Sequence, residues 1–150
     1  MDIKSIKIVE AQEEDLGQIF EFVRQLAEYE KEPESVTTNL SEYEKCFKDR
    51  VFEAIIAKQG SEAVGMALFY TTFSTWKGKM IYLEDFIVLE TFRRMGIGEM
   101  LFDAFIEIAK KKDAKLAKWQ VLDWNTPAVD FYLKKKAIIE KNWWNGKIIF

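Results

Sequence analysis

Residues 80–88 read MIYLEDFIV, and this stretch decides how the fold of the chain is organised. Apolar side chains occupy both alternating faces of the stretch, which is typical of a central strand that is covered on two sides. Two carboxylates, Glu84 and Asp85, nevertheless stand in its middle. A carboxylate that is buried without a partner is costly, so such groups are candidates for function.

Two explanations without a functional role remain open for these carboxylates. In the first, they pair with nearby Lys or Arg side chains, and in the second, a β-bulge lets one of them reach solvent. Side chains of neighbouring residues on a regular strand point to opposite faces. We therefore expect that Glu84 and Asp85 do not share one site.

Hydrophobic periodicity predicts the remaining elements on both sides of this strand. Helices are predicted over residues 14–29, 41–48, 98–111 and 127–135, the last with Thr126 as its cap and Pro127 in its first turn. Strands are predicted over residues 3–9, 51–58, 63–72, 80–88 and 116–122, with terminal strands at 138–139 and 147–150.

The order of these elements indicates the fold class. Three consecutive middle strands indicate an antiparallel meander, and the strand–helix–strand unit that follows indicates a parallel pair. We therefore expect an α+β (mixed α/β) protein. Its central, mixed, mostly antiparallel and twisted sheet would have about six to seven strands flanked by helices. No Pro/Gly/Ser-rich linker interrupts the 150 residues, so a single domain over 1–150 is predicted.

Composition excludes several classes of protein. The chain is 49% hydrophobic and 31% charged, which rules out a disordered tail. It has no His and one Cys, which excludes His-dependent triads and Cys-rich metal sites, so no metal is expected. The net charge of −3 comes without a dominant basic patch, which argues against nucleic acid as a partner.

Nothing in the sequence predicts a membrane partner. No window approaches roughly 18 consecutive apolar residues. Residues 1–5 lack the apolar stretch of a signal peptide. A cytoplasmic location is therefore expected.

The segment RRMGIG over residues 93–98 joins the central strand to the next predicted helix. Glycine allows several backbone N–H groups to converge, and a helix N-terminus adds positive potential, so a phosphate or pyrophosphate fits there. The segment lacks both the Lys-Ser/Thr of a Walker loop and the third glycine of a dinucleotide fingerprint. Taken alone, it is more typical of a tight turn.

The segment NTPAVDFY over residues 125–132 opens the last predicted helix. Ala128, Phe131, Tyr132 and Lys135 fall on one mostly apolar face of that helix, so Tyr132 is expected to point inward. A tyrosine of the core and a tyrosine that donates a proton both fit this position.

These three segments resemble the GNAT acetyltransferase superfamily. Residues 93–98 match its phosphate loop, R/Q-x-x-G-x-G/A, and residues 125–132 resemble its following motif. The chain is also similar to the spermidine/spermine and thialysine N-acetyltransferase branch in LAEYEK at 26–31, STWKGK at 74–79, IYLED at 81–85 and VLDWN at 121–125. Polyamine-acetylating members carry an Asp where Ser74 stands, which favours the thialysine type.

The resemblance implies an acetyl-CoA-dependent N-acetyltransferase that acts on a primary amine of a small molecule. The acceptor would be thialysine- or lysine-like, or a diamine or polyamine, and would attack directly in a ternary complex. Such an amine, with a pKa of about 10, is protonated at neutral pH and must first lose a proton. Glu84 matches the family's residue for this step, acting through water, and is expected to be buried. Tyr132 matches the acid that protonates the departing thiolate.

The resemblance also implies where the two substrates bind. Five residues match positions near the amine, where carboxylates attract a cation; they are Tyr29, Glu30, Glu84, Asp85 and Trp119. Trp119 also fits the core. Among the residues that would contact acetyl-CoA, Lys134 and Lys135 also fit a solvated face. Acetyl-CoA would be held by the central strand, the phosphate loop and the last helix, through Phe86, Ile87, Val88, Arg93, Arg94, Met95, Gly96, Ile97, Gly98, Glu99, Asn125, Pro127, Phe131, Tyr132, Lys134 and Lys135.

Two alternative functions stay open, namely a catalytically silent acyl-CoA-binding module and a peptide or protein N-acetyltransferase. Members of the branch are typically homodimers, so a homodimer is implied, and the Trp143-Trp144 pair fits either an interface or the core. Lys136 stands where a Gly with positive φ is common, which predicts a cost in stability. Residues 139–143 look shorter than in relatives and present different charges to the acceptor.

Overall fold

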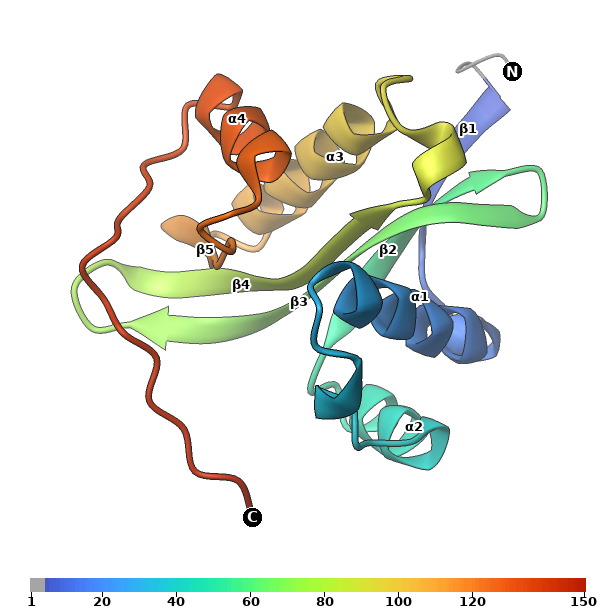
Figure 1. The fold of residues 1–150 in the computed structure, drawn as a ribbon, viewed down its shortest axis with the longest axis horizontal. Coiled ribbons are helices and arrows are strands. Elements are labelled where there is room, and N and C mark those ends of the chain that lie inside the picture. Colours follow the sequence, from blue (N-terminus) through green and yellow to red (C-terminus); the bar gives the residue numbers. More distant parts are fainter. Residues whose placement is uncertain (1–4) are drawn as a thin grey trace. The chain divides into compact units, whose positions relative to one another are not determined.

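The computed structural model describes residues 5–150 (Figure 1). The described chain forms two compact units, of which the larger ends at Gln120 and the smaller is Val121–Phe150. The larger unit contains a five-stranded sheet in the order β1-β2-β3-β4-β5. Its strands are β1 (Ile6–Glu10), β2 (Glu53–Gln59), β3 (Glu62–Ser74), β4 (Gly78–Val88) and β5 (Leu116–Trp119). Ile3, which begins the first predicted strand, lies outside the described residues. The single domain over 1–150 stays a prediction.

The sheet is mixed, as the order of elements predicted. Strands β1 to β4 pair antiparallel with their neighbours, and β5 pairs parallel with β4. The connection from β4 to β5 runs through a helix, because parallel strands need a crossover. The α+β class, the meander and the parallel pair are therefore confirmed.

Three α-helices belong to the larger unit and one to the smaller unit. They are α1 (Leu16–Tyr29), α2 (Leu40–Lys48), α3 (Ile97–Lys111) and α4 (Thr126–Lys134). Among the described residues, the connections also contain short 3-10 helices, namely η2 (Glu13–Asp15), η3 (Pro33–Ser35) and η4 (Glu90–Phe92).

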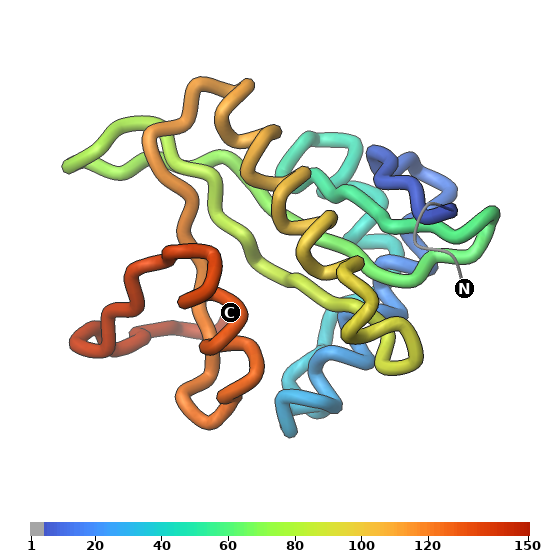
Figure 2. Tube along the Cα trace, turned by 90° about the horizontal axis from the view of Figure 1, so that it is seen from above, coloured from blue at the N-terminus to red at the C-terminus, as the bar shows by residue number. Residues whose placement is uncertain are grey.

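Helices cover both faces of the sheet in the larger unit. Figure 1 shows α1 and α2 on one side of β3 and β4, and α3 on the other. On the first side, α1 packs its buried residues against Met66, Leu68 and Ile87. On the second side, Phe105 of α3 packs against Phe69, with ring centroids 5.4 Å apart. Figure 2 shows α3 running alongside β4, and the tip of the β3–β4 hairpin extending beyond it.

The expectation of six to seven strands is wrong for the described residues, which form five. Residues 137–150 contain neither helix nor strand, so the terminal strands at 138–139 and 147–150 do not form (Figure 1). An alternating apolar pattern becomes a strand only where a neighbour pairs with its backbone. Trp143 and Trp144 lie in this segment, and 69% and 96% of their surfaces are exposed. A homodimer, with these two residues at its interface, stays a prediction.

None of the helices in residues 5–150 has the length and apolar content that crossing a membrane requires.

All four α-helices of the described chain end in the same way, with a non-glycine residue in the left-handed region. These residues are Lys31, Arg50, Asp113 and Lys136, with φ between 57° and 65°. In each case the next backbone N–H donates to the carbonyl five residues earlier, as Ala137 does to Tyr132 at 3.0 Å. This bond is the mark of a Schellman motif, in which glycine is the favoured residue. The positive φ predicted at Lys136 is confirmed.

We expect Lys136→Gly to raise the free energy of unfolding by about 1 kcal/mol. A Cβ in the left-handed region is strained, and glycine relieves that strain. Urea denaturation of the variant and the parent chain measures the change. Lys136→Ala is the matched control, since it shortens the side chain but keeps the Cβ. An equal gain in both variants would contradict the backbone explanation.

Candidate active site

A β-bulge in β4 determines where Glu84 and Asp85 lie. Asp85 is paired with Leu68 of β3 and Leu83 with Phe69, so Glu84 is an extra residue without a cross-strand partner. Leu68 belongs to the core cluster under α1, whereas Phe69 packs on α3. An extra residue interrupts the alternation of side chains along a strand. Glu84 and Asp85 therefore both lie on the side of α1 and α2.

This arrangement overturns one expectation and confirms another. The expectation that Glu84 and Asp85 do not share one site is wrong, because it assumed a regular strand. The alternative of a β-bulge that lets one carboxylate reach solvent is confirmed, since Glu84 is exposed and Asp85 is partly buried. The alternative of pairing with Lys or Arg is wrong, because within residues 5–150 neither carboxylate forms an ion pair.

The fold strongly raises the proton affinity of Asp85. Burial raises the pKa of Asp85 to about 7, and the negative charges of Glu84 and Glu30 add to that increase. Burial also raises the pKa of Glu30, the residue that ends α1. Three carboxylates from two elements thus lie within electrostatic range of one another, which makes this region strongly negative.

Glu84 is exposed, so the expectation that it is buried is wrong. The bulge turns the Glu84 side chain toward solvent, whereas the Asp85 side chain is partly buried. The Tyr70 hydroxyl donates a hydrogen bond of 3.0 Å to Oε2 of Glu84. Tyr70 lies directly opposite Tyr82, and their rings stack with centroids 5.4 Å apart and planes 21° apart.

Tyr43 of α2 approaches the same carboxylates from the helix side. Burial raises its pKa to about 12, with further increases from the charges of Asp85 and Glu84. Sequence reasoning did not single out Tyr43, Tyr70 or Tyr82. For Tyr70 and Tyr82, the alternation of side chains along β3 and β4 was a signal, because it places both on one face of the sheet. The register that brings them together cannot be predicted from either strand alone.

Tyr29, at the end of α1, is linked to the segment that follows β4. The Arg93 guanidinium lies over the Tyr29 ring at 5.3 Å, and Arg93 Nε donates a 3.0 Å hydrogen bond to the Val88 carbonyl. Arg93 thus joins the end of α1 to the end of β4. Its predicted contact with a pyrophosphate stays a prediction.

Trp119 lies on the other face of the sheet. Its ring packs edge-on against Phe102 of α3, with centroids 5.5 Å apart. The carboxylates face α1 and α2, so the structure does not group Trp119 with them. Its packing on Phe102 agrees with the core alternative, and its predicted place near the amine stays a prediction.

The pairing of β4 with β5 ends before β4 itself does. β5 is paired with β4 only over Met80–Leu83, whereas β4 continues to Val88. After β4 the chain passes through Arg94, which has φ 64°, to Gly96, which has φ 83° and begins α3 without a side-chain cap. An uncapped helix start beside two exposed arginines suits an anionic group. The residues present therefore fit the pyrophosphate of a CoA thioester.

The remaining predicted residues belong to the smaller unit. Asn125, rather than Thr126, caps α4, because its Oδ1 accepts a 3.4 Å hydrogen bond from the Ala128 N–H. Tyr132 is buried, and its ring lies edge-on to Phe131 at 5.5 Å. Lys134 is exposed and Lys135 partly buried. The roles assigned to these residues stay predictions.

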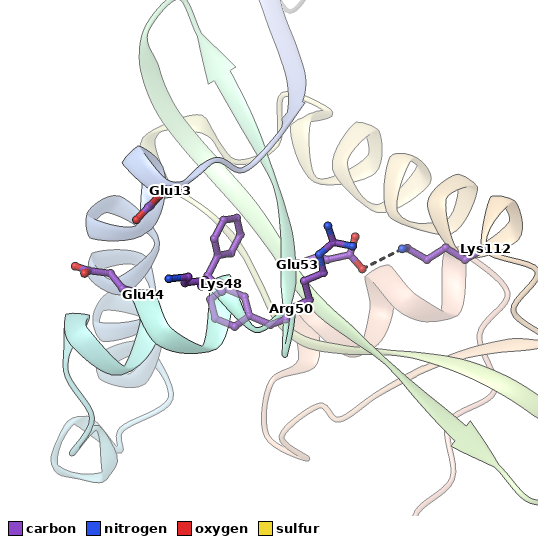
Figure 3. Close-up of a pocket in the computed structure, with 8 residues that line it drawn as sticks. Glu13, Glu44, Lys48, Arg50, Glu53 and Lys112 are labelled. Carbon is purple, nitrogen blue, oxygen red and sulfur yellow. Dashed lines mark ion pairs between the residues drawn. The ribbon is translucent and has the colours of Figure 1, made fainter.

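Figure 3 shows a separate pocket between α2, the start of β2 and the end of α3. Its volume is about 560 Å³. Its lining mixes the aromatic rings of Phe47 and Phe52 with charges of both signs. Glu53 and Lys112 form an ion pair of 3.0 Å across one side of it. None of the predicted site residues lines this pocket, so it is not the site described above.

Comparisons with known sequences find matches over most of this chain. The Acetyltransferase (GNAT) family pattern matches residues 15–136. A thialysine N-epsilon-acetyltransferase of Sus scrofa is 36% identical over 156 residues, which cover 95% of this chain and 91% of that protein. One from Caenorhabditis elegans is 34% identical over 130 residues, which cover 87% and 81%.

A solved structure shares the fold. An aminoglycoside acetyltransferase from an uncultured soil metagenomic sample, in complex with trehalose, superposes with a TM-score of 0.83. The two sequences are 19% identical, and the match covers 99% of this chain and 98% of that one. At this identity the likeness concerns the fold alone.

We expect Asp85→Asn to become more stabilising as the pH rises. The pKa of Asp85 in the fold, about 7, lies above its ordinary value of 3.8. The protonated form therefore favours the fold, and this stability is complete below about pH 4 and lost as the pH rises through about 7. Between pH 5 and pH 8, the advantage of the variant in free energy of unfolding should grow by about 2 kcal/mol.

Denaturant titrations at both pH values measure this change. Asp130→Asn, at an exposed position of α4, is the control and should show no such growth. A difference between Asp85→Asn and the parent chain that stays constant from pH 5 to pH 8 would refute the prediction.

Proposed function

Since the chain belongs to the GNAT acetyltransferase family and is an N-acetyltransferase, we propose that it acetylates a primary amine of a small cationic molecule. The proposed acceptor is thialysine- or lysine-like, and it attacks acetyl-CoA directly in a ternary complex. The thialysine acetyltransferases among the relatives support this class, as does Ser74 at the position where polyamine-acetylating enzymes carry an Asp.

The observation that carries the proposal is the group of three carboxylates, Glu30, Glu84 and Asp85. Burial raises the pKa of Asp85, and the negative charges of Glu84 and Glu30 raise it further, so a cation that enters this group is favoured. A cationic amine compensates that charge, and the field of the group draws the cation in. An acceptor that carries a second ammonium group gains more from this region than a neutral amine does.

Glu84 is proposed as the proton acceptor. An amine with a pKa of about 10 arrives protonated and cannot attack a thioester until it loses that proton. Glu84 is exposed, and one of its oxygens is already held by Tyr70. Water therefore reaches the carboxylate and relays the proton from the ammonium group. Asp85 and Glu30, which are less exposed, hold the positive charge of the acceptor.

Acetyl-CoA supplies the activated acetyl group when it is bound. Backbone groups of Phe86, Ile87 and Val88 are proposed to hold the pantetheine arm, where β4 continues past its last pair with β5. Residues 93–99 and the start of α3 are proposed to hold the pyrophosphate, with Arg94 as a cation. In α4 and its cap, Asn125, Pro127, Phe131, Lys134 and Lys135 are proposed as further contacts.

Tyr132 is proposed as the acid that protonates the departing thiolate. The motif of residues 125–132 supports this role, and its buried position in α4 shields the phenol from bulk water. Direct transfer of the acetyl group needs no nucleophile from the protein, which suits a chain without His.

The acceptor is tested by following thiol release from acetyl-CoA with thialysine, lysine, ornithine, putrescine, spermidine and a lysine-containing peptide. We expect the amino-acid acceptors to have the highest kcat/KM. Glu84→Gln should lower kcat about 100-fold, since a general base contributes on that order. Glu62→Gln, an exposed charge at the start of β3, is the control and should keep the parent rate. Preference for the peptide would refute the proposed acceptor class.

Tyr132→Phe should lower kcat about 100-fold and leave the dissociation constant of acetyl-CoA nearly unchanged, because the ring is kept and only the proton is lost. Part of the loss should be recovered with an acetyl thioester of a more acidic thiol, which leaves without protonation. Stopped-flow kinetics and calorimetry measure both quantities. Equal losses with both thioesters would remove Tyr132 from the acid role.

A further inference from the structure

The Tyr70 ring is fixed in place by its cross-strand neighbour. Tyr70 and Tyr82 are opposite each other in the β3–β4 pairing, and their rings stack with centroids 5.4 Å apart. Cross-strand aromatic pairs restrict each other's side-chain freedom. The Tyr70 hydroxyl is therefore presented at a defined height above the sheet.

The hydroxyl remains a donor over the whole working range of pH. Burial raises the pKa of Tyr70, and the hydrogen bond to Glu84 and the charge of Glu84 raise it further. Tyr70 therefore keeps its proton, and its hydroxyl donates a hydrogen bond of 3.0 Å to Oε2 of Glu84. A bond from a neutral donor to a carboxylate is stronger than one between neutral groups.

Glu84 needs such a restraint because of where it stands. It is the extra residue of the bulge, without a cross-strand partner, and its side chain is exposed. An exposed Glu side chain samples several rotamers, and ordering them costs free energy. Within residues 5–150, the bond from Tyr70 is the one hydrogen bond that holds this carboxylate. It occupies Oε2 and leaves Oε1 as the acceptor for a proton.

We propose that Tyr70 is a positioning residue that holds Glu84 in the orientation in which Oε1 receives the proton of the acceptor amine. The inference rests on the role proposed above for Glu84. It adds a residue of β3 to a site that otherwise comes from β4 and α1. Tyr70 itself exchanges no proton with the substrate.

The test is a double-mutant cycle with a matched control. Tyr70→Phe removes the hydroxyl that bonds Glu84, whereas Tyr82→Phe removes a hydroxyl from the stacked ring that bonds nothing within the described residues. We expect Tyr70→Phe to lower kcat about tenfold, equivalent to about 1.4 kcal/mol of transition-state stabilisation. The KM for acetyl-CoA and the melting temperature should stay at the parent values, and Tyr82→Phe should keep the parent kcat.

The decisive comparison is made in the Glu84→Gln background. If Tyr70 acts through Glu84, Tyr70→Phe lowers kcat no further there, so the two effects are not additive. An equal tenfold loss in both backgrounds, or equal rates for Tyr70→Phe and Tyr82→Phe in the parent chain, would overturn the inference while the role of Glu84 stands. A parent rate for Glu84→Gln alone would overturn the proposed base, and the role of Tyr70 with it.

Discussion

One extra residue in β4 is the constraint on which the site depends. Without it, Glu84 and Asp85 would alternate across the sheet, one toward α1 and one toward α3. The bulge between Leu68 and Phe69 shifts the register by one, and both carboxylates come to the α1 side while Phe86 returns to the α3 side, where it packs on Phe102. This arrangement has a cost, because burial raises the pKa of Asp85 and the neighbouring charge of Glu84 raises it further.

In the proposed reaction, β4 contributes to the binding of both substrates, because the middle of the strand and the segment that follows it carry opposite charges. The middle of β4 carries the negative charge that suits a cationic amine. The segment that follows it carries Arg93 and Arg94 and leads to the uncapped start of α3, which suits an anion. Arg93 connects the two regions, since its guanidinium contacts the Tyr29 ring and the Val88 carbonyl. In the proposed reaction, the central strand would therefore set the distance between acceptor and donor.

Much of the fold followed from local patterns. Helical spacing of apolar residues identified α1, α2, α3 and α4 to within two residues at either end, because burying one face of a helix imposes that period wherever the helix lies. The prediction of terminal strands at 138–139 and 147–150 was wrong, because a pattern of apolar residues does not show whether a partner strand is present. β5 likewise ends at Trp119, three residues before its predicted end, where its pairing with β4 stops.

The sequence by itself determined the order of the elements, the two adjacent carboxylates in a central strand, the glycine-containing loop before α3 and the left-handed position of Lys136. These features depend on residues that are close together in the chain. Periodicity and spacing record the first three, and the resemblance to the family indicated the left-handed position of Lys136. Only the tertiary structure decided which carboxylate is exposed, that both face α1, and that Tyr70 bonds Glu84 from fourteen residues away. Each of these depends on the register between β3 and β4, and a register is a property of two paired strands that neither strand encodes alone.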